Sequence, residues 1–96
     1  MINRLYQLGN RMDYINFTNR LIAAPEKEIG QLGMFREGVK SDDKYNLFLV
    51  KGAGITTQSK SNLIKICAEN PKHAKDTIAF LSKLTKIPQE RFKLKW

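Results

Sequence analysis

The sequence predicts an α+β fold, in which a small, mostly antiparallel sheet is covered by a C-terminal helical pair and ends in a short C-terminal strand. Three patterns predict it. Residues 45–50 are apolar at nearly every position, which is typical of a buried strand. Residues 71–86 repeat their apolar side chains with the period of an α-helix, and residues 91–96 alternate apolar and cationic side chains as a half-buried strand does. The chain has 96 residues, enough for a single small globular domain over residues 1–96.

The first half of the chain gives less distinct patterns. Residues 2–8 carry apolar side chains at helical spacing, which predicts a short first helix. Residues 13–23 fit the period of a helix or of a strand, and their content of Tyr, Ile, Phe and Thr favours a strand. Pro25 is typical of a helix start, and residues 32–38 could pair with residues 45–50 as a hairpin.

Two helices are expected in the second half, over residues 59–69 and 71–86. The dipeptide Asn70-Pro71 separates them, because asparagine is a favoured N-cap and proline suits the first helical position. These helices would cover a sheet built around residues 45–50 and 91–96.

Charge is distributed unevenly along the chain, whose formal net charge is +8 at pH 7. Residues 1–43 hold six cations and six anions, whereas residues 44–96 hold eleven cations and three anions and so carry the whole excess. Ten of those eleven cations are lysines. Lysine is a mobile point charge that suits a phosphate backbone, while bidentate reading of bases uses arginine. The charge therefore favours an anionic partner and argues against an acidic mimic of nucleic acid.

Lysines mark the candidate binding residues. The predicted helix over residues 71–86 places four of them on one side, along about 21 Å of helix, far enough to follow several phosphates. The same pattern would also suit a helix face that is merely solvated. Two further lysines flank a loop with Gly52 and Gly54, which is expected to lead from a strand to a helix N-terminus that could hold a phosphate. The candidates for contact with nucleic acid or an acidic partner are Lys51, Lys60, Lys72, Lys75, Lys83 and Lys86.

The rings of the last strand allow two interpretations. Phe92 or Trp96 could stack on nucleic-acid bases, but the alternation implies one buried face and favours packing of both rings in the core.

The sequence offers little for catalysis. One histidine and one cysteine, His73 and Cys67, are too few for a zinc site, and Cys67 falls on the apolar side of its expected helix. The glycine loop matches neither the Walker nor the dinucleotide pattern, and no paired carboxylates are evident. We therefore expect a protein that is not an enzyme and uses no cofactor and no metal.

The expected function is non-catalytic binding of an RNA or DNA backbone through the lysine-rich C-terminal half. The alternative is a small protein-binding inhibitor or adaptor that docks on an acidic surface of a host protein complex. The 28 Lys, Ile and Asn residues suit an AT-rich genome such as that of a phage or mobile element, where such inhibitors are common. A lone cysteine favours the reducing cytoplasm, and no apolar run is long enough for a membrane span. The sequence leaves a homodimer open.

Overall fold

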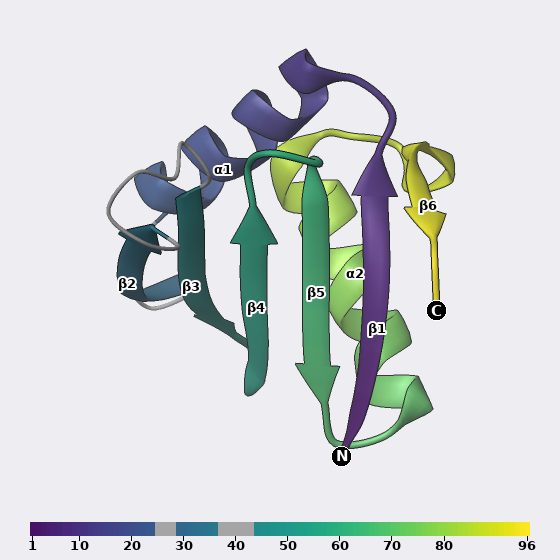
Figure 1. Cartoon of the computed structure of the whole chain (residues 1–96). Helices are drawn as coiled ribbons and strands as arrows, with labels where there is room; N and C mark the ends of the chain where they lie inside the picture. The colour runs from purple at the N-terminus through teal and green to yellow at the C-terminus, as the bar shows by residue number, and fades with distance from the viewer. Residues whose placement is uncertain (25–28, 37–43) are drawn as a thin grey trace.

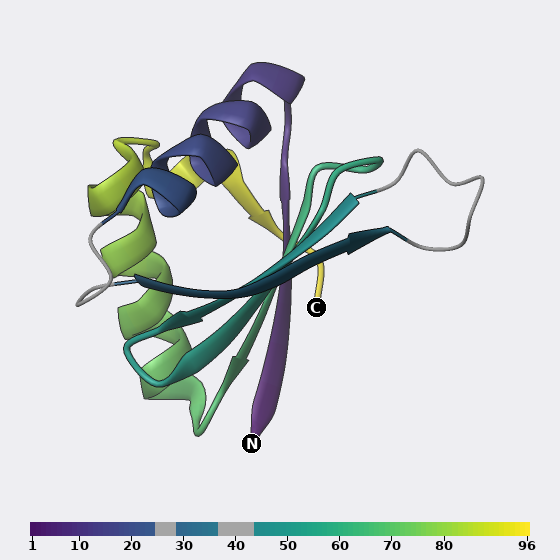
Figure 2. The same cartoon turned by 90° about the vertical axis from the view of Figure 1, so that its left-hand side faces the viewer.

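The computed structural model describes residues 1–24, 29–36 and 44–96. Within these residues the chain forms two layers, a six-stranded antiparallel sheet and two α-helices that lie on the same side of it (Figure 1, Figure 2). The predicted α+β class, the antiparallel sheet and the short C-terminal strand are confirmed. In chain order the elements are β1 (Ile2–Leu8), α1 (Arg11–Ala23), β2 (Ile29–Arg36), β3 (Lys44–Val50), β4 (Ala53–Gln58), β5 (Leu63–Ala68), α2 (Pro71–Thr85), the 3-10 turn η1 (Gln89–Arg91) and β6 (Phe92–Leu94).

The strand order is β2-β3-β4-β5-β1-β6. Strands β2 to β5 succeed one another as a meander, each pairing with the next. Strand β1 then lies between β5 and β6, so that Gln7 is opposite Leu63 on one side and Tyr6 is opposite Leu94 on the other. The first and last strands of the chain are therefore neighbours, as Figure 1 shows.

The core lies between the sheet and the two helices. Alternate strand residues point into it, and Phe17 of α1 meets Phe92 of β6 edge to face, with ring centroids 5.8 Å apart. The buried apolar residues are Leu8, Tyr14, Phe17, Leu21, Phe48, Val50, Ala53, Ile55, Ile64, Ile66, Ala68, Ala74, Ile78, Leu81, Ile87 and Phe92. No helix of the described segments covers the opposite face of the sheet (Figure 2), which we call the open face.

Two predictions for the first half are wrong. Residues 2–8 form strand β1 and not a short helix. Residues 13–23 belong to α1 and not to a strand, because Tyr14, Phe17 and Leu21 bury one helical side against the sheet. The β2–β3 hairpin does form, although β2 begins earlier than expected. The helix start expected at Pro25 lies outside the described residues.

In the second half, the helix predicted over residues 59–69 is wrong. This segment is a turn that leads into β5, in which Ile64, Ile66 and Ala68 are buried at the two-residue period of a strand. The helices that cover the sheet are therefore α1 and α2 rather than two adjacent helices. The helix predicted over residues 71–86 is confirmed as α2, with the side chain of Asn70 accepting a hydrogen bond from the His73 N–H at 2.8 Å.

Candidate nucleic-acid interface

The outer side of α2 carries three of the six candidate lysines, and a fourth, Lys86, follows the helix directly as its C-cap, with a left-handed backbone (φ 61°). The inner side of α2 is fixed by Ala74, Ile78 and Leu81, which are buried against the sheet. At 3.6 residues per turn the opposite side is then exposed, and it carries a row of cations with Asp76 beside them. We call this row the α2 lysine stripe; its members are Lys72, Lys75, Lys83 and Lys86, all exposed.

Lys51 lies beside α2. It occupies the two-residue turn between β3 and β4, where Lys51 and Gly52 both have positive φ, 52° and 81°, as a type I′ hairpin requires. The Lys51 Nζ lies 4.8 Å from the centre of the Phe80 ring on α2, which is the geometry of a cation–π contact. Five of the six candidate lysines are therefore on or beside α2.

His73 holds this turn in place through both of its ring nitrogens. Nδ1 accepts a hydrogen bond from the Glu69 N–H at 3.1 Å, and Nε2 lies 2.8 Å from the Lys51 carbonyl oxygen. Because Nδ1 is an acceptor here, Nε2 carries the ring proton and donates a hydrogen bond to the backbone carbonyl oxygen of Lys51. His73 thus positions Lys51, and its ring is not directed at Cys67.

The prediction that the segment around Gly52 and Gly54 leads to a helix N-terminus that could hold a phosphate is wrong. The turn leads into strand β4 and not into a helix, and the first turn of α2 meets it through the ring of His73. The role of these glycines is in the hairpin itself, where Gly52 adopts the left-handed backbone conformation that glycine tolerates.

Lys60 lies apart from Lys51. It is in the turn between β4 and β5, at the other end of β4 from Lys51. Arg11 at the start of α1 approaches this same turn, donating to the Ser59 carbonyl and, at 3.0 Å, to Asn62 Oδ1. A six-residue strand is about 20 Å long, so Lys60 and Lys51 do not flank one loop.

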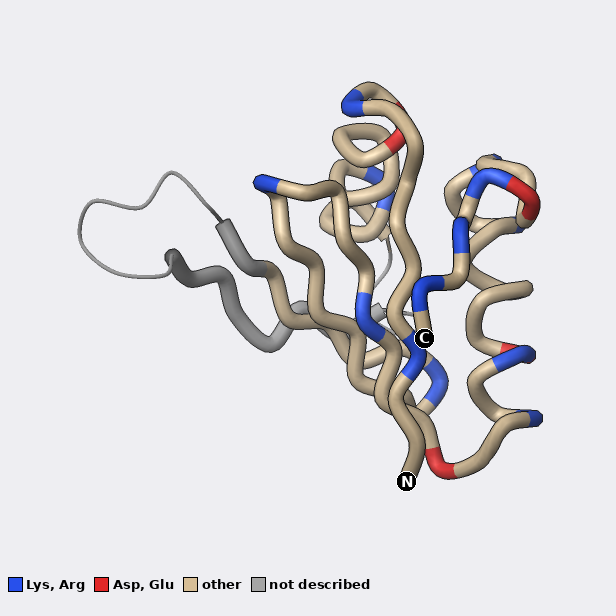
Figure 3. The backbone as a smooth tube through the Cα atoms, turned by 45° about the vertical axis from the view of Figure 1, so that its right-hand side comes forward, with Lys and Arg blue, Asp and Glu red and all other residues tan. Residues whose placement is uncertain are grey.

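A second basic cluster, which the sequence reasoning missed, lies on the open face. Lys65 stands between the buried Ile64 and Ile66 of β5 and so points away from the helices, with Leu5 of β1 as its cross-strand neighbour. Figure 3 shows cations gathered near the C-terminus, apart from those along α2. We call Lys65, Lys93 and Lys95, all exposed, the sheet lysine cluster.

The pairing at the end of the chain places Lys95 and Trp96 together. The Lys95 N–H donates to the Leu5 carbonyl at 2.7 Å, and the Leu5 N–H donates to the Trp96 carbonyl at 2.8 Å. Two successive residues thus oppose one, which is the pattern of a β-bulge. The expectation that both terminal rings pack is half right, since Phe92 is 5% exposed and Trp96 is 59% exposed.

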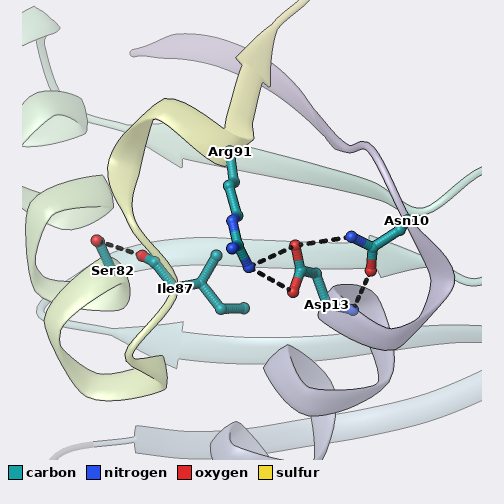
Figure 4. Close-up of polar contacts among 5 residues, drawn as sticks. All are labelled: Asn10, Asp13, Ser82, Ile87 and Arg91. Carbon is teal, nitrogen blue, oxygen red and sulfur yellow. Dashed lines mark hydrogen bonds and ion pairs between the residues drawn. The ribbon is translucent and has the colours of Figure 1, made fainter.

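An ion pair ties the start of α1 to the segment that precedes β6. Arg91 donates to both carboxylate oxygens of Asp13, at 3.2 and 3.4 Å (Figure 4). The Asn10 side chain caps α1 by accepting a hydrogen bond from the Asp13 N–H, and its amide nitrogen donates to the Asp13 carboxylate. Ser82 on α2 donates to the Ile87 carbonyl in the same region. Asn10, Asp13 and Arg91 line a shallow hollow together with Gly9, Glu90 and Lys93. We assign the hydrogen-bonded network a structural role, because it joins α1 to the segment before β6.

Cys67 and Tyr6 are two further titratable groups in the described part of the chain. Cys67 lies on the open side of β5, with Sγ 3.5 Å from the Met1 sulfur. Burial raises the pKa of the Tyr6 phenol above 10.0, while the Arg4 charge acts in the opposite direction. Across residues 1–24, 29–36 and 44–96, no group of three or more His, Cys, Asp or Glu residues could hold a metal ion.

Comparison with known proteins returned no match: no family model, no curated protein and no solved structure is similar to this chain. In the described part of the chain, neither helix has the length and apolar character that crossing a membrane requires.

Proposed function

We propose that this protein binds the backbone of RNA or DNA without catalysis, through the α2 lysine stripe. The observation that carries the proposal is the placement of Lys72, Lys75 and Lys83 on one exposed side of α2, with Lys86 at its C-cap and Lys51 against its Phe80 ring. The cations are held by a packed helix and a hydrogen-bonded turn, so they share one surface before any ligand arrives.

The chemistry of the stripe suits phosphates more than bases. Lysine ammonium groups attract phosphate as point charges, and the outer side of α2 offers no Arg, Asn or Gln for bidentate contact with a base. Binding would therefore tolerate many sequences. Each phosphate contact releases counterions, so affinity is expected to fall steeply with salt concentration.

The test is fluorescence anisotropy of a labelled duplex of mixed sequence across a salt series. For each lysine that contacts a phosphate, the slope of log affinity against log salt should include about −0.9. We expect Lys75→Gln and Lys83→Gln each to weaken binding and to make the slope shallower by about that amount. Lys60→Gln, which removes the same charge at the other end of β4, is the matched control. Equal losses for Lys60→Gln and Lys83→Gln would refute a localised interface.

The alternative function, a protein-binding inhibitor or adaptor, is favoured by one observation on α1. The outer side of this helix exposes Met12 at 64%, Ile15 at 38% and Ile22 at 51%, and Arg11 and Arg20 lie near its two ends. An apolar row of this spacing with a basic rim suits a protein groove with an acidic rim. The test is a pull-down after nuclease treatment. If it recovers one protein in stoichiometric amount, if the Ile22→Lys variant no longer retains that protein, and if no nucleic acid binds, the adaptor function replaces the first proposal.

A further inference from the structure

The open face carries the sheet lysine cluster, and the chain continues from Lys95 directly into Trp96, an exposed aromatic residue. Lys65 and Lys95 flank Leu5 of β1 from either side, because β5 and the end of the chain both pair with it. Lys93 is opposite Gln7 on the same face, and Trp96 comes directly after Lys95. Trp96 is 59% exposed.

From this arrangement we infer that the sheet lysine cluster and Trp96 bind a single-stranded nucleic acid. The three ammonium groups contact phosphates and the indole ring stacks on a base. The inference rests on the proposed function only in taking nucleic acid as the ligand. It assigns the open face instead of the α2 lysine stripe, and a single-stranded ligand instead of a duplex.

The spacing of the groups fits a single strand that crosses β5, β1 and β6. Neighbouring strands are about 4.8 Å apart, so the backbones at Lys65 and Lys95 are separated by about 10 Å, and Lys93 and Lys95 by about 7 Å along one strand. Lysine side chains can bridge these distances to neighbouring phosphates. Single-strand binding proteins combine such a basic track with aromatic platforms on which bases stack.

The indole ring of Trp96 favours a single-stranded over a double-stranded nucleic acid. In a duplex the flat faces of the bases are covered by their neighbours in the stack, and an indole ring has nothing to stack on without unstacking them. Bases of a single strand are free to stack, and this contact is largely independent of sequence.

Charge and burial on this face favour a nucleic acid over a protein partner. None of the outward-facing residues of β1, β4, β5 and β6 is acidic; they are Asn3, Leu5, Gln7, Gly54, Thr56, Gln58, Leu63, Lys65, Cys67 and Lys93. The leucines among them, Leu5 and Leu63, are half-buried. On β3, Leu49 lies opposite Gly54 and is 45% exposed, so one apolar side chain is open on this face as well. The three exposed ammonium groups outnumber it, which favours a polyanion over an apolar protein surface.

The experiment uses Trp96 as its own reporter, since it is the only tryptophan in the chain. The full-length protein is titrated with a fifteen-nucleotide oligo-dT, with a blunt duplex of equal length, and with poly-glutamate as a polyanion that has no bases. We expect oligo-dT to quench the tryptophan fluorescence in a saturable manner, and the other two probes to leave it nearly unchanged.

A second measurement monitors labelled oligo-dT by anisotropy. Trp96→Leu should weaken its binding at least about fivefold, the lower end for loss of one stacked base, while binding of the duplex stays the same. Lys93→Gln should make the salt slope for oligo-dT shallower, whereas Lys83→Gln on α2 should affect only the duplex. Circular dichroism melting of each variant separates loss of binding from loss of fold.

The outcomes separate the two proposals. If oligo-dT binds without quenching and Trp96→Leu leaves its affinity unchanged, the open-face site is refuted while the α2 lysine stripe stands. Quenching by poly-glutamate as strong as that by oligo-dT would refute base stacking and indicate a site for acidic polymers in general. If single strands quench Trp96 but the duplex does not bind, the stripe is refuted and the open face stands.

Discussion

The two helices are alike where they meet the sheet and unlike where they meet solvent. Both begin at an asparagine whose side chain accepts from a backbone N–H at 2.8 Å, and both bury apolar side chains against the same face. Outside, α2 presents lysines, whereas α1 presents Met12, Ile15 and Ile22. Because the sheet makes the same demand on both helices, the difference between their outer sides is not required by the fold. The outer sides are therefore where we look for partners.

The two N-caps also differ in what surrounds them. Asn10 belongs to a network with Asp13 and Arg91 that joins α1 to the last part of the chain. Asn70 caps α2 through the His73 N–H, and His73 in turn holds Lys51. The cap of α1 thus supports the fold, and the cap of α2 also supports the candidate interface.

The largest loss of stability is expected from substitutions on the inner sides of the helices, and it should be similar for α1 and α2. Phe17→Ala on α1 should lower the free energy of unfolding by about 3–5 kcal/mol and Leu81→Ala on α2 by about 2–5 kcal/mol, because each opens a cavity under a side chain that is 0% exposed. Urea denaturation monitored by circular dichroism measures both. A loss below about 1 kcal/mol for either would mean that the helix concerned is not packed as described.

The caps should give the next largest effect and distinguish the helices. Asn70→Ala should cost about 1 kcal/mol, the usual value for an N-cap. Asn10→Ala should cost more, about 2 kcal/mol, because it removes the cap and also the 3.3 Å hydrogen bond to the Asp13 carboxylate. The same denaturation experiment compares them, with Asp13→Asn in combination to show whether the excess comes from the network. Equal losses for the two caps would remove this distinction.

The smallest effect is expected on the outer sides. Ile22→Ser on α1 and Lys83→Ser on α2 should each change the free energy of unfolding by no more than about 0.5 kcal/mol, since both side chains are exposed. Thermal melting suffices to check this. A loss above about 1 kcal/mol for Ile22→Ser would show that another part of the chain covers this side of α1, which would argue against its use as a docking surface.

The sequence predicted well where a segment has one buried side. Helix α2 separates apolar from cationic residues at a single clear period, and its predicted boundaries are close to those observed. The strand predicted over residues 91–96 forms only at Phe92–Leu94, and of its alternating apolar residues only Phe92 is buried. Helix α1 could not be predicted in this way, because it is apolar on its inner and outer sides and so lacks a helical contrast. The segment from Leu63 to Cys67 misled for a related reason, since half-buried apolar residues alternate there with fully buried ones.

The residues of the candidate site could likewise be predicted only where their secondary structure was predicted correctly. The α2 lysine stripe could be predicted because it lies on a correctly predicted helix. Lys65 was missed because the prediction placed its segment in a helix, which hides the face it shares with Leu5. Lys60 was wrongly grouped with Lys51, because no local pattern reveals that β4 holds the two turns apart.

The position of β1 makes the sheet depend on contacts between residues that are far apart in the sequence. Its neighbours, Leu63 on β5 and Leu94 on β6, come much later in the chain than β1 itself. Strands β2 to β5 each pair with the next strand in sequence and can form hairpins without β1, whose two edges stay unpaired until the distant strands reach it. The sheet lysine cluster draws on β5 and on the segment around β6, so it is assembled only when the sheet closes around β1.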